Sequence, residues 1–157
     1  MLSEKKNFVL IYRFYYFFAV GFGSGLSRFA PGTVGTLWAW AIFLILDLFF
    51  NNHVWLVFII FSFFLGIFVS NQVEKKLKKK DPSEIVIDEV VGQWLVLCIV
   101  PINIKMYIIS FILFRFFDIL KPWPINIIEK KFKGGFGIMI DDILAAIYSI
   151  IVLIILN

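Results

Sequence analysis

Apolar residues in this chain form long runs that short polar or charged segments separate. The runs span Phe8–Phe22, Leu37–Phe50, Val54–Val69, Val90–Val100, Met106–Phe117 and Ile143–Leu156. None of them alternates apolar and polar residues with the period of two that is typical of a half-buried strand. An open sheet edge would also leave its backbone groups without hydrogen-bond partners in lipid. The pattern therefore predicts an all-α chain.

Most of these runs are shorter than the roughly 20 residues that cross the apolar core of a bilayer. Only Val54–Val69 comes near that length. Length alone leaves three interpretations open: tilted short spans, re-entrant half-helices, or core helices of a soluble bundle. No hinge rich in Ser, Pro or Gly divides the chain, so we expect a single domain over residues 1–157.

Composition favours a lipid environment. The chain is 61% hydrophobic and contains 20 Phe residues, and its mean hydropathy is +0.94. A soluble domain is usually close to half apolar, and this excess would leave large apolar patches in water. We therefore expect a multi-helical membrane protein with short transmembrane or re-entrant helices.

Basic residues are grouped, and their placement predicts an orientation. The net charge is +4, with lysines concentrated at Lys75–Lys80 and Lys130–Lys133. Next to so much apolar sequence, such groups favour an anionic membrane surface over nucleic acid. The positive-inside rule puts Lys75–Lys80 in the cytoplasm. The two apolar runs Val90–Val100 and Met106–Phe117 then form a hairpin that returns the chain to the same side, where Lys130–Lys133 lie. Most of the polar motifs fall on that side, so we expect an active site that faces the cytoplasm.

Two pairs of adjacent acids stand at the start of apolar runs. Asp88 and Glu89 precede Val90–Val100, and Asp141 and Asp142 precede the last run. We expect a glycine turn at residues 134–137 to deliver the second pair to the head of the last helix. A helix N-terminus favours one acid of each pair, but it does not explain both. Burying one uncompensated charge in a membrane costs about 2.5–3.5 kcal/mol on insertion scales.

A third charged motif lies near Pro122. Arg115, Asp118 and Lys121 follow one another at i, i+3 and i+6, so on a helix they share a face with Asp118 between two cations. A salt-bridged helix end is the structural alternative. Because the flanking residues are apolar, we expect the three charges to face a polar cavity or each other. Two cations and an acid suit a phosphate and its metal.

A glycine-rich stretch, residues 21–36, leads into the second apolar run. It contains GFGSG and APGTVGT, and glycine lets a backbone approach a ligand closely. We expect a helix to begin near Thr36, with Thr33 and Thr36 as N-caps or, together with Ser24, as phosphate contacts. The stretch lacks the lysine of a P-loop, so it is not a nucleotide-binding motif.

The available side chains narrow the chemistry to a carboxylate-bound metal. Mg²⁺ prefers hard oxygen ligands, whereas a single cysteine and a single histidine exclude a Cys/His zinc site. The residue six positions after Cys98 is Ile104 rather than arginine, and the chain contains no Asp-x-Asp. Cysteine and aspartyl phosphatase chemistry are thereby excluded, which leaves metal-assisted hydrolysis.

Four blocks carry a family resemblance. They are GFGSGLSRFAPGTVGT at residues 21–36, DPSEIVIDEVVG at 81–92, FRFFDILKPWP at 114–124 and GGFGIMIDD at 134–142. Together and in this order they resemble the phosphatidylglycerophosphatase A family of bacterial membrane enzymes. The resemblance implies Mg²⁺-dependent hydrolysis of phosphatidylglycerophosphate to phosphatidylglycerol and phosphate. It also implies a multi-pass location in the inner membrane.

Roles follow as hypotheses from the motifs and the resemblance. Mg²⁺ is expected on Asp88, Glu89, Asp141 and Asp142, with Glu89 as the candidate general base. Arg115 and Lys121 are expected to clamp the phosphate, and Asp118 either to orient them or to complete the metal site. Ser24, Thr33 and Thr36 are expected to contact phosphate or glycerol.

Two other functions remain as alternatives. A membrane transporter or channel with an intramembrane carboxylate site would also place acids near lipid. An alcohol phosphatidyltransferase also uses carboxylate-bound metal, but its motif begins with Asp-Gly, and this chain has no such dipeptide.

Overall fold

A computed structural model describes residues 2–101 and 103–156, and its elements are all helical over those ranges. The helices are α1 (Leu2–Ala19), η1 (Gly21–Leu26), α2 (Pro31–Leu46), α3 (Asn52–Leu77), α4 (Ile87–Leu97), α5 (Ile104–Leu120), α6 (Ile125–Lys131) and α7 (Gly134–Leu156). η1 is a 3₁₀ helix and the others are α-helices. The prediction of an all-α chain is confirmed.

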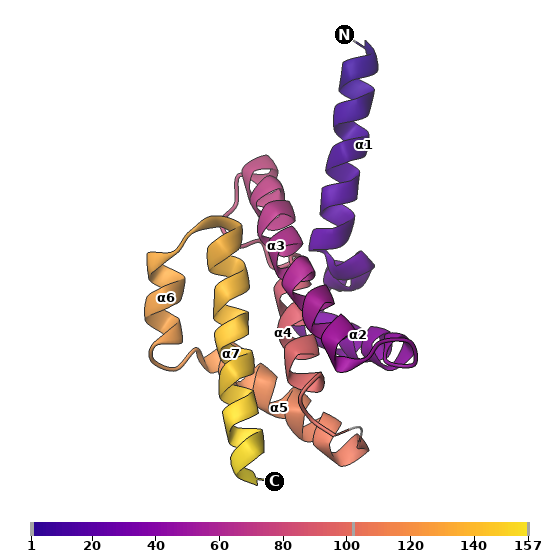
Figure 1. Ribbon diagram of the computed structural model, residues 1–157. Coiled ribbons are helices and arrows are strands. Elements are labelled where there is room, and N and C mark those ends of the chain that lie inside the picture. Colours follow the sequence, from indigo (N-terminus) through magenta and orange to yellow (C-terminus); the bar gives the residue numbers. More distant parts are fainter. Residues whose placement is uncertain (1, 102, 157) are drawn as a thin grey trace.

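Helix α4 lies at the centre of the bundle. It packs against α2, α3, α5 and α7, and α7 in turn packs against α3, α5 and α6. Figure 1 shows α6 on the outer side of α7, and α1 alongside α3 before α1 extends beyond the rest of the molecule. The short helix α4 is thus surrounded, which explains why so much of it is buried.

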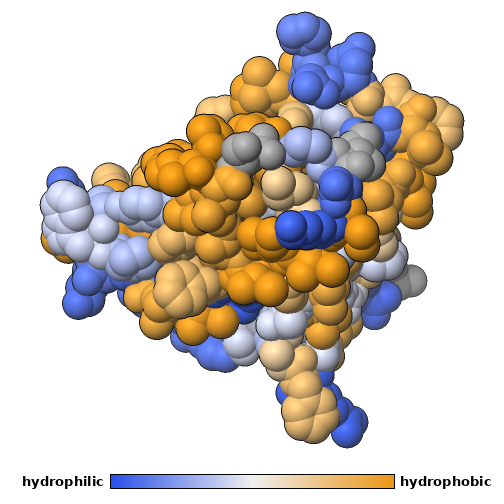
Figure 2. All heavy atoms as spheres, turned by 90° about the horizontal axis from the view of Figure 1, so that it is seen from below, coloured by the Kyte–Doolittle hydropathy of each residue, from blue (hydrophilic) through white to orange (hydrophobic). Residues whose placement is uncertain are grey.

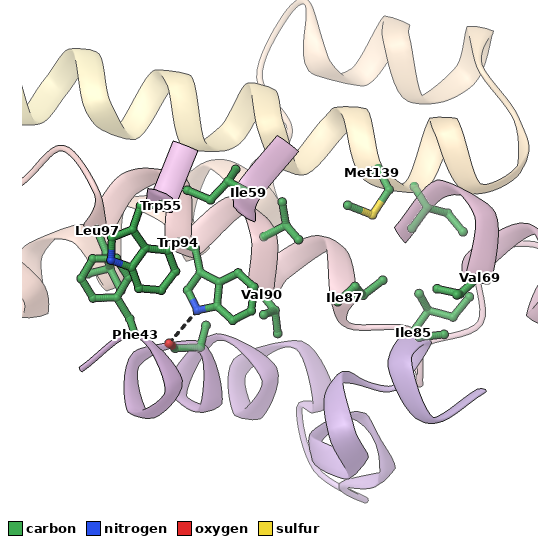
Figure 3. Close-up of a cluster of buried hydrophobic side chains, with 14 of the residues drawn as sticks. Phe43, Trp55, Ile59, Val69, Ile85, Ile87, Val90, Trp94, Leu97 and Met139 are labelled. Atoms are coloured by element: carbon green, nitrogen blue, oxygen red, sulfur yellow. Dashed lines mark hydrogen bonds between the residues drawn. The ribbon is translucent and has the colours of Figure 1, made fainter. Parts of the chain in front are cut away.

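Aromatic side chains fill the core at the C-terminal end of α4. Trp94 is buried and donates its indole N–H to the carbonyl oxygen of Ala39 at 2.9 Å (Figure 3). Phe43 of α2 stacks on Trp55 of α3 with ring centroids 4.3 Å apart. Buried indole N–H groups need an acceptor, and this hydrogen bond fixes how α4 sits against α2.

Two helices begin earlier than the apolar pattern predicts. The helix expected near Thr36 begins at Pro31, with Ala30 as its N-cap residue in a left-handed conformation. Proline suits the first helical position because its missing N–H would be unpaired there anyway. The interpretation of Thr33 and Thr36 as N-caps is therefore wrong, since both lie inside α2.

The last helix begins at Gly134, so the expected glycine turn before Asp141 is wrong. Gly134 and Gly135 form the first turn of α7 because the helix there passes directly over α3. A Cβ atom on Gly135 would lie 2.0 Å from the carbonyl oxygen of Ile67. The side-chain oxygen of Asn71 accepts the N–H of Gly135 at 2.8 Å. The glycines were expected to form a turn, but they are needed for the close packing of α7 on α3.

Two described helices, α3 and α7, are long and apolar enough to cross a membrane. Helix α3 runs well past Val69 and carries Lys75 and Lys76 in its last turn. Large apolar side chains are widely exposed, among them Phe61 and Phe64 of α3 and Ile155 of α7. Figure 2 shows one such face, on which hydrophobic residues predominate. These features are consistent with a membrane protein.

Candidate active site

Asp88 and Glu89 lie in the first turn of α4, and the segment that precedes them is held tightly in place. Val86 packs on the backbone of α2 at Gly35, where an added Cβ atom would lie 2.8 Å from the Val86 side chain. The N–H of Val86 donates to the carbonyl oxygen of Ala19 at 3.0 Å. Contacts on both sides of Val86 thus fix the point at which α4 begins and the direction of its first-turn carboxylates.

Asp142 reaches the same place from α7. Ligand oxygens of Asp88, Glu89 and Asp142 all lie within 4.8 Å of one another. Because α7 begins at Gly134, Asp142 is about two turns inside the helix and not at its head. An N-terminal dipole therefore does not explain it. The three acids, which we call the carboxylate cluster, come from segments far apart in the sequence and converge as predicted.

The carboxylate cluster is buried and short of partners. Asp88 is 8% exposed and Asp142 is 3% exposed. One oxygen of each member, Asp88 Oδ1, Glu89 Oε2 and Asp142 Oδ2, is buried without a hydrogen-bond donor among the described residues. Burying an oxygen without a hydrogen-bond partner costs free energy. A bound cation would offset this cost in the carboxylate cluster.

The pKa values of Asp88 and Glu89 are raised because these acids are buried among other negative charges. Burial raises the pKa of Asp88 well above its usual value, and the negative charges of Glu89 and Asp142 raise it further. Burial also raises the pKa of Glu89, while a hydrogen bond with Asp88 and the charge of Arg115 act against the rise. A divalent cation would supply the missing positive charge, and carboxylate oxygens are the ligands that Mg²⁺ prefers. The donor set therefore fits Mg²⁺.

Arg115 of α5 borders the carboxylate cluster. Its Nη1 atom lies 2.5 Å from Asp118 Oδ2 and 3.5 Å from Glu89 Oε1. The guanidinium side chain is only 15% exposed, and its Nε atom has no acceptor among the described residues. Asp118 thus holds an arginine that retains a donor for an anion beside the cluster.

The first turn of α2 closes this part of the site. A Cβ atom on Gly32 would lie 2.1 Å from Glu89 Oε1 and 3.0 Å from the terminal nitrogens of Arg115. Any side chain here would displace one of those two groups. Gly32 belongs to the glycine-rich stretch that the sequence singled out, but its approach to Glu89 and Arg115 is a tertiary contact that the sequence did not reveal.

Lys121 pairs with Asp141 and Glu129, whereas Arg115 pairs with Asp118, so the predicted arrangement with Asp118 between the two cations is wrong. Lys121 caps α5 in a left-handed conformation, and its Nζ atom lies 2.5 Å from Asp141 Oδ2 and 3.2 Å from Glu129 Oε1. Burial alone would lower the pKa of Lys121, but Asp141 and then Glu129 raise it above its ordinary value. Lys121 is therefore a firmly charged cation. Asp141 is its partner and lies outside the converging group of three.

The hydroxyl groups proposed to bind substrate are mostly engaged within their own helices. Ser24 donates to the carbonyl oxygen of Gly21, and the buried Thr36 donates to that of Gly32, both at 2.8 Å. Thr33 is half-buried in the first turn of α2, next to Gly32. Of the three residues, Thr33 is thus the one directly next to Gly32 in the chain.

Glu129 is a second residue that the sequence did not reveal. It sits in α6, a seven-residue helix that the apolar pattern did not predict. The available signal was weak, since Glu129 directly precedes Lys130 and Lys131 in a short segment. Its ion pair with Lys121 depends on the packing of α6 against α7, which the sequence did not predict.

A carboxylate cluster bordered by an arginine, in a bundle with two helices able to cross a membrane, fits a membrane-associated phosphatase. The model of the family "Phosphatidylglycerophosphatase A" matches residues 17–157. The chain belongs to the phosphatidylglycerophosphatase A family. The predicted class of enzyme is confirmed, and nothing favours a transporter.

Three curated relatives illustrate the match. "Phosphatidylglycerophosphatase A" of Haemophilus influenzae is 44% identical over 85% of this chain and 83% of its own length. "Phosphatidylglycerophosphatase A" of Escherichia coli K12 is 37% identical, covering 83% and 76%. A "Putative phosphatidylinositol-3-phosphatase" of Bacteroides thetaiotaomicron is 44% identical, covering 85% and 87%. No solved structure matches the chain.

Proposed function

We propose that this protein hydrolyses the phosphomonoester of phosphatidylglycerophosphate to give phosphatidylglycerol and inorganic phosphate, with Mg²⁺ in the carboxylate cluster. The observation that carries the proposal is the convergence of three buried carboxylates, each with an unpartnered oxygen, next to Arg115. The names of the Haemophilus influenzae and Escherichia coli relatives support the choice of substrate.

Asp88, Glu89 and Asp142 are the proposed metal ligands. When bound there, Mg²⁺ supplies a Lewis acid that polarises a water and neutralises phosphoryl oxygens. Asp141, which the sequence placed among the ligands, is proposed instead to hold Lys121, because one of its oxygens is already in that ion pair.

The cationic residues are proposed to bind the phosphoryl group. Arg115 offers a planar donor fork suited to phosphate oxygens, and Asp118 fixes its position at 2.5 Å. Lys121 supplies a second positive charge. Glu89 is the proposed general base, since its Oε2 atom is buried and unpartnered and can accept the proton of the attacking water.

The proposed location is the inner membrane, multi-pass, with the site facing the cytoplasm. Gly134, where α7 begins, lies beside Asn71 and Glu74 near the end of α3, so these two ends share one side. Lys75 and Lys76 end α3 on that side, and Lys130 and Lys131 end α6 just before α7. Lysine-rich ends favour the cytoplasmic side.

Phosphate release from purified protein in detergent micelles tests the proposal. We expect release from phosphatidylglycerophosphate with Mg²⁺ and none with EDTA. Phosphatidylinositol 3-phosphate is the competing substrate, given the name of the Bacteroides thetaiotaomicron relative. Hydrolysis of that lipid without hydrolysis of phosphatidylglycerophosphate would overturn the proposed substrate. Equal rates with Mg²⁺ and EDTA would overturn the proposed metal.

A further inference from the structure

Helix α1 runs alongside the C-terminal part of α3 (Figure 1). A hollow lies between these two helices, and none of its lining residues belongs to the carboxylate cluster. It has a volume of about 210 Å³. The residues that line it, which we call the α1–α3 groove, are Ile11, Tyr12, Tyr15, Gln72, Lys75 and Lys76. The first three precede residue 17, where the match to the family begins.

The groove combines apolar surface with several hydrogen-bond donors. The six lining residues include two lysines, two tyrosines and a glutamine, which are hydrogen-bond donors, and no acid. Burial, then Tyr16 and Glu84, raise the pKa of Tyr12, which keeps its hydroxyl protonated as a donor. Glu84 does not line the groove, and its Oε2 atom lies 4.0 Å from Lys79 Nζ.

Apolar side chains continue from the groove along both helices. Phe14 of α1 is 56% exposed and Phe68 of α3 is 47% exposed. Tyr15 packs edge-to-face on Phe68 with ring centroids 5.2 Å apart, and Lys76 lies 5.8 Å above the ring of Tyr12. Hydrogen-bond donors at the end of α3 are therefore followed along the helix by an apolar surface. A phospholipid has the same arrangement, with a polar headgroup followed by apolar acyl chains.

We propose that the α1–α3 groove binds one anionic phospholipid, with the headgroup phosphate between Lys75, Lys76 and the tyrosine hydroxyls. Charge complementarity selects this occupant, because the lining residues are basic and neutral. Lys75 and Lys76 lie in the last turn of α3, a candidate membrane span, where a lysine reaches the headgroup region. The site is independent of the proposed hydrolysis, since none of its residues belongs to the carboxylate cluster.

Lipid binding in a non-ionic detergent tests the groove without the potential of a bilayer surface. The full chain is titrated with phosphatidylglycerol or phosphatidylcholine, and bound lipid is counted by native mass spectrometry. We expect one tightly retained phosphatidylglycerol per chain. In the Lys75→Gln/Lys76→Gln variant, we expect its affinity to fall roughly tenfold or more, the scale of losing hydrogen bonds to a charged group.

The matched control removes the same charge outside the groove. The Lys130→Gln/Lys131→Gln variant, whose two lysines end α6, should retain phosphatidylglycerol nearly as wild type does. The Tyr12→Phe/Tyr15→Phe variant keeps the packed rings and loses both hydroxyls, so its affinity should fall severalfold with an unchanged thermal midpoint. Equal losses in the two lysine variants, or equal retention of phosphatidylcholine and phosphatidylglycerol by wild type, would overturn the proposal.

Discussion

At the scale of single residues, the site depends on negative charges that the fold holds together against their repulsion. Asp88 and Asp142 are nearly fully buried, and the carboxylate cluster contains more oxygens than donors. The negative charges of Asp118 and Glu89 also repel a negative charge on Asp142. Such an arrangement costs stability unless a cation occupies it. Metal binding and protein stability are therefore linked at these residues.

Replacing one ligand should separate activity from folding. We expect Asp88→Asn and Asp142→Asn each to lower turnover by roughly a hundredfold or more, the usual scale for losing a central electrostatic group. In EDTA, both variants should melt no lower than wild type, because each removes a buried negative charge. Phosphate-release kinetics and thermal melts of purified protein measure the two effects.

Asp47→Asn is the matched control. Asp47 lies at the far end of α2, where its side chain accepts the indole N–H of Trp55 at 2.9 Å. This variant should keep wild-type turnover. If Asp88→Asn and Asp142→Asn both remained active, the assignment of the carboxylate cluster would be wrong.

At the scale of helices, the sequence predicted chemistry better than boundaries. Asp88, Glu89 and Asp142 stood out because acids beside long apolar runs need a partner, and the structure brings them together. The start of α7 was missed because Gly135 is required by the backbone of α3. The pairing of Lys121 with Asp141 was missed because it joins residues 20 positions apart in different helices. Contacts of that kind carry no local periodicity.

The first turn of α2 offers a test of helix placement. Gly32→Ala should preserve or raise helix stability, because alanine is favoured over glycine in a helix by roughly 1 kcal/mol. Its Cβ atom would nevertheless collide with Glu89 and crowd Arg115. We expect turnover to fall at least tenfold while circular dichroism stays unchanged. Wild-type turnover in this variant would show that α2 does not pack against the site as described.

At the scale of the whole molecule, metal binding should stabilise the bundle, since the carboxylate cluster joins α4 to α7. A ligand that binds only the folded state at a hundred times its Kd adds about 2.7 kcal/mol. We therefore expect Mg²⁺ to raise the thermal midpoint of wild-type protein in detergent. Asp142→Asn should lose this rise, whereas Asp47→Asn should keep it. A similar Mg²⁺ response in wild type and Asp142→Asn would place the ion elsewhere.

The orientation of α3 is the remaining whole-molecule prediction. Asn51 caps the start of α3, whereas Lys79 follows its end, so the two flank an apolar helix of 26 residues. At about 1.5 Å per residue, that helix is long enough to cross a bilayer core of roughly 30 Å. With Cys98 replaced by serine, single cysteines at positions 51 and 79 can be labelled with a membrane-impermeant maleimide. In inverted inner-membrane vesicles, we expect label at position 79 and none at 51, with the reverse in intact spheroplasts. Label at both positions from one side would mean that α3 does not cross, and the cytoplasmic site would lose its main support.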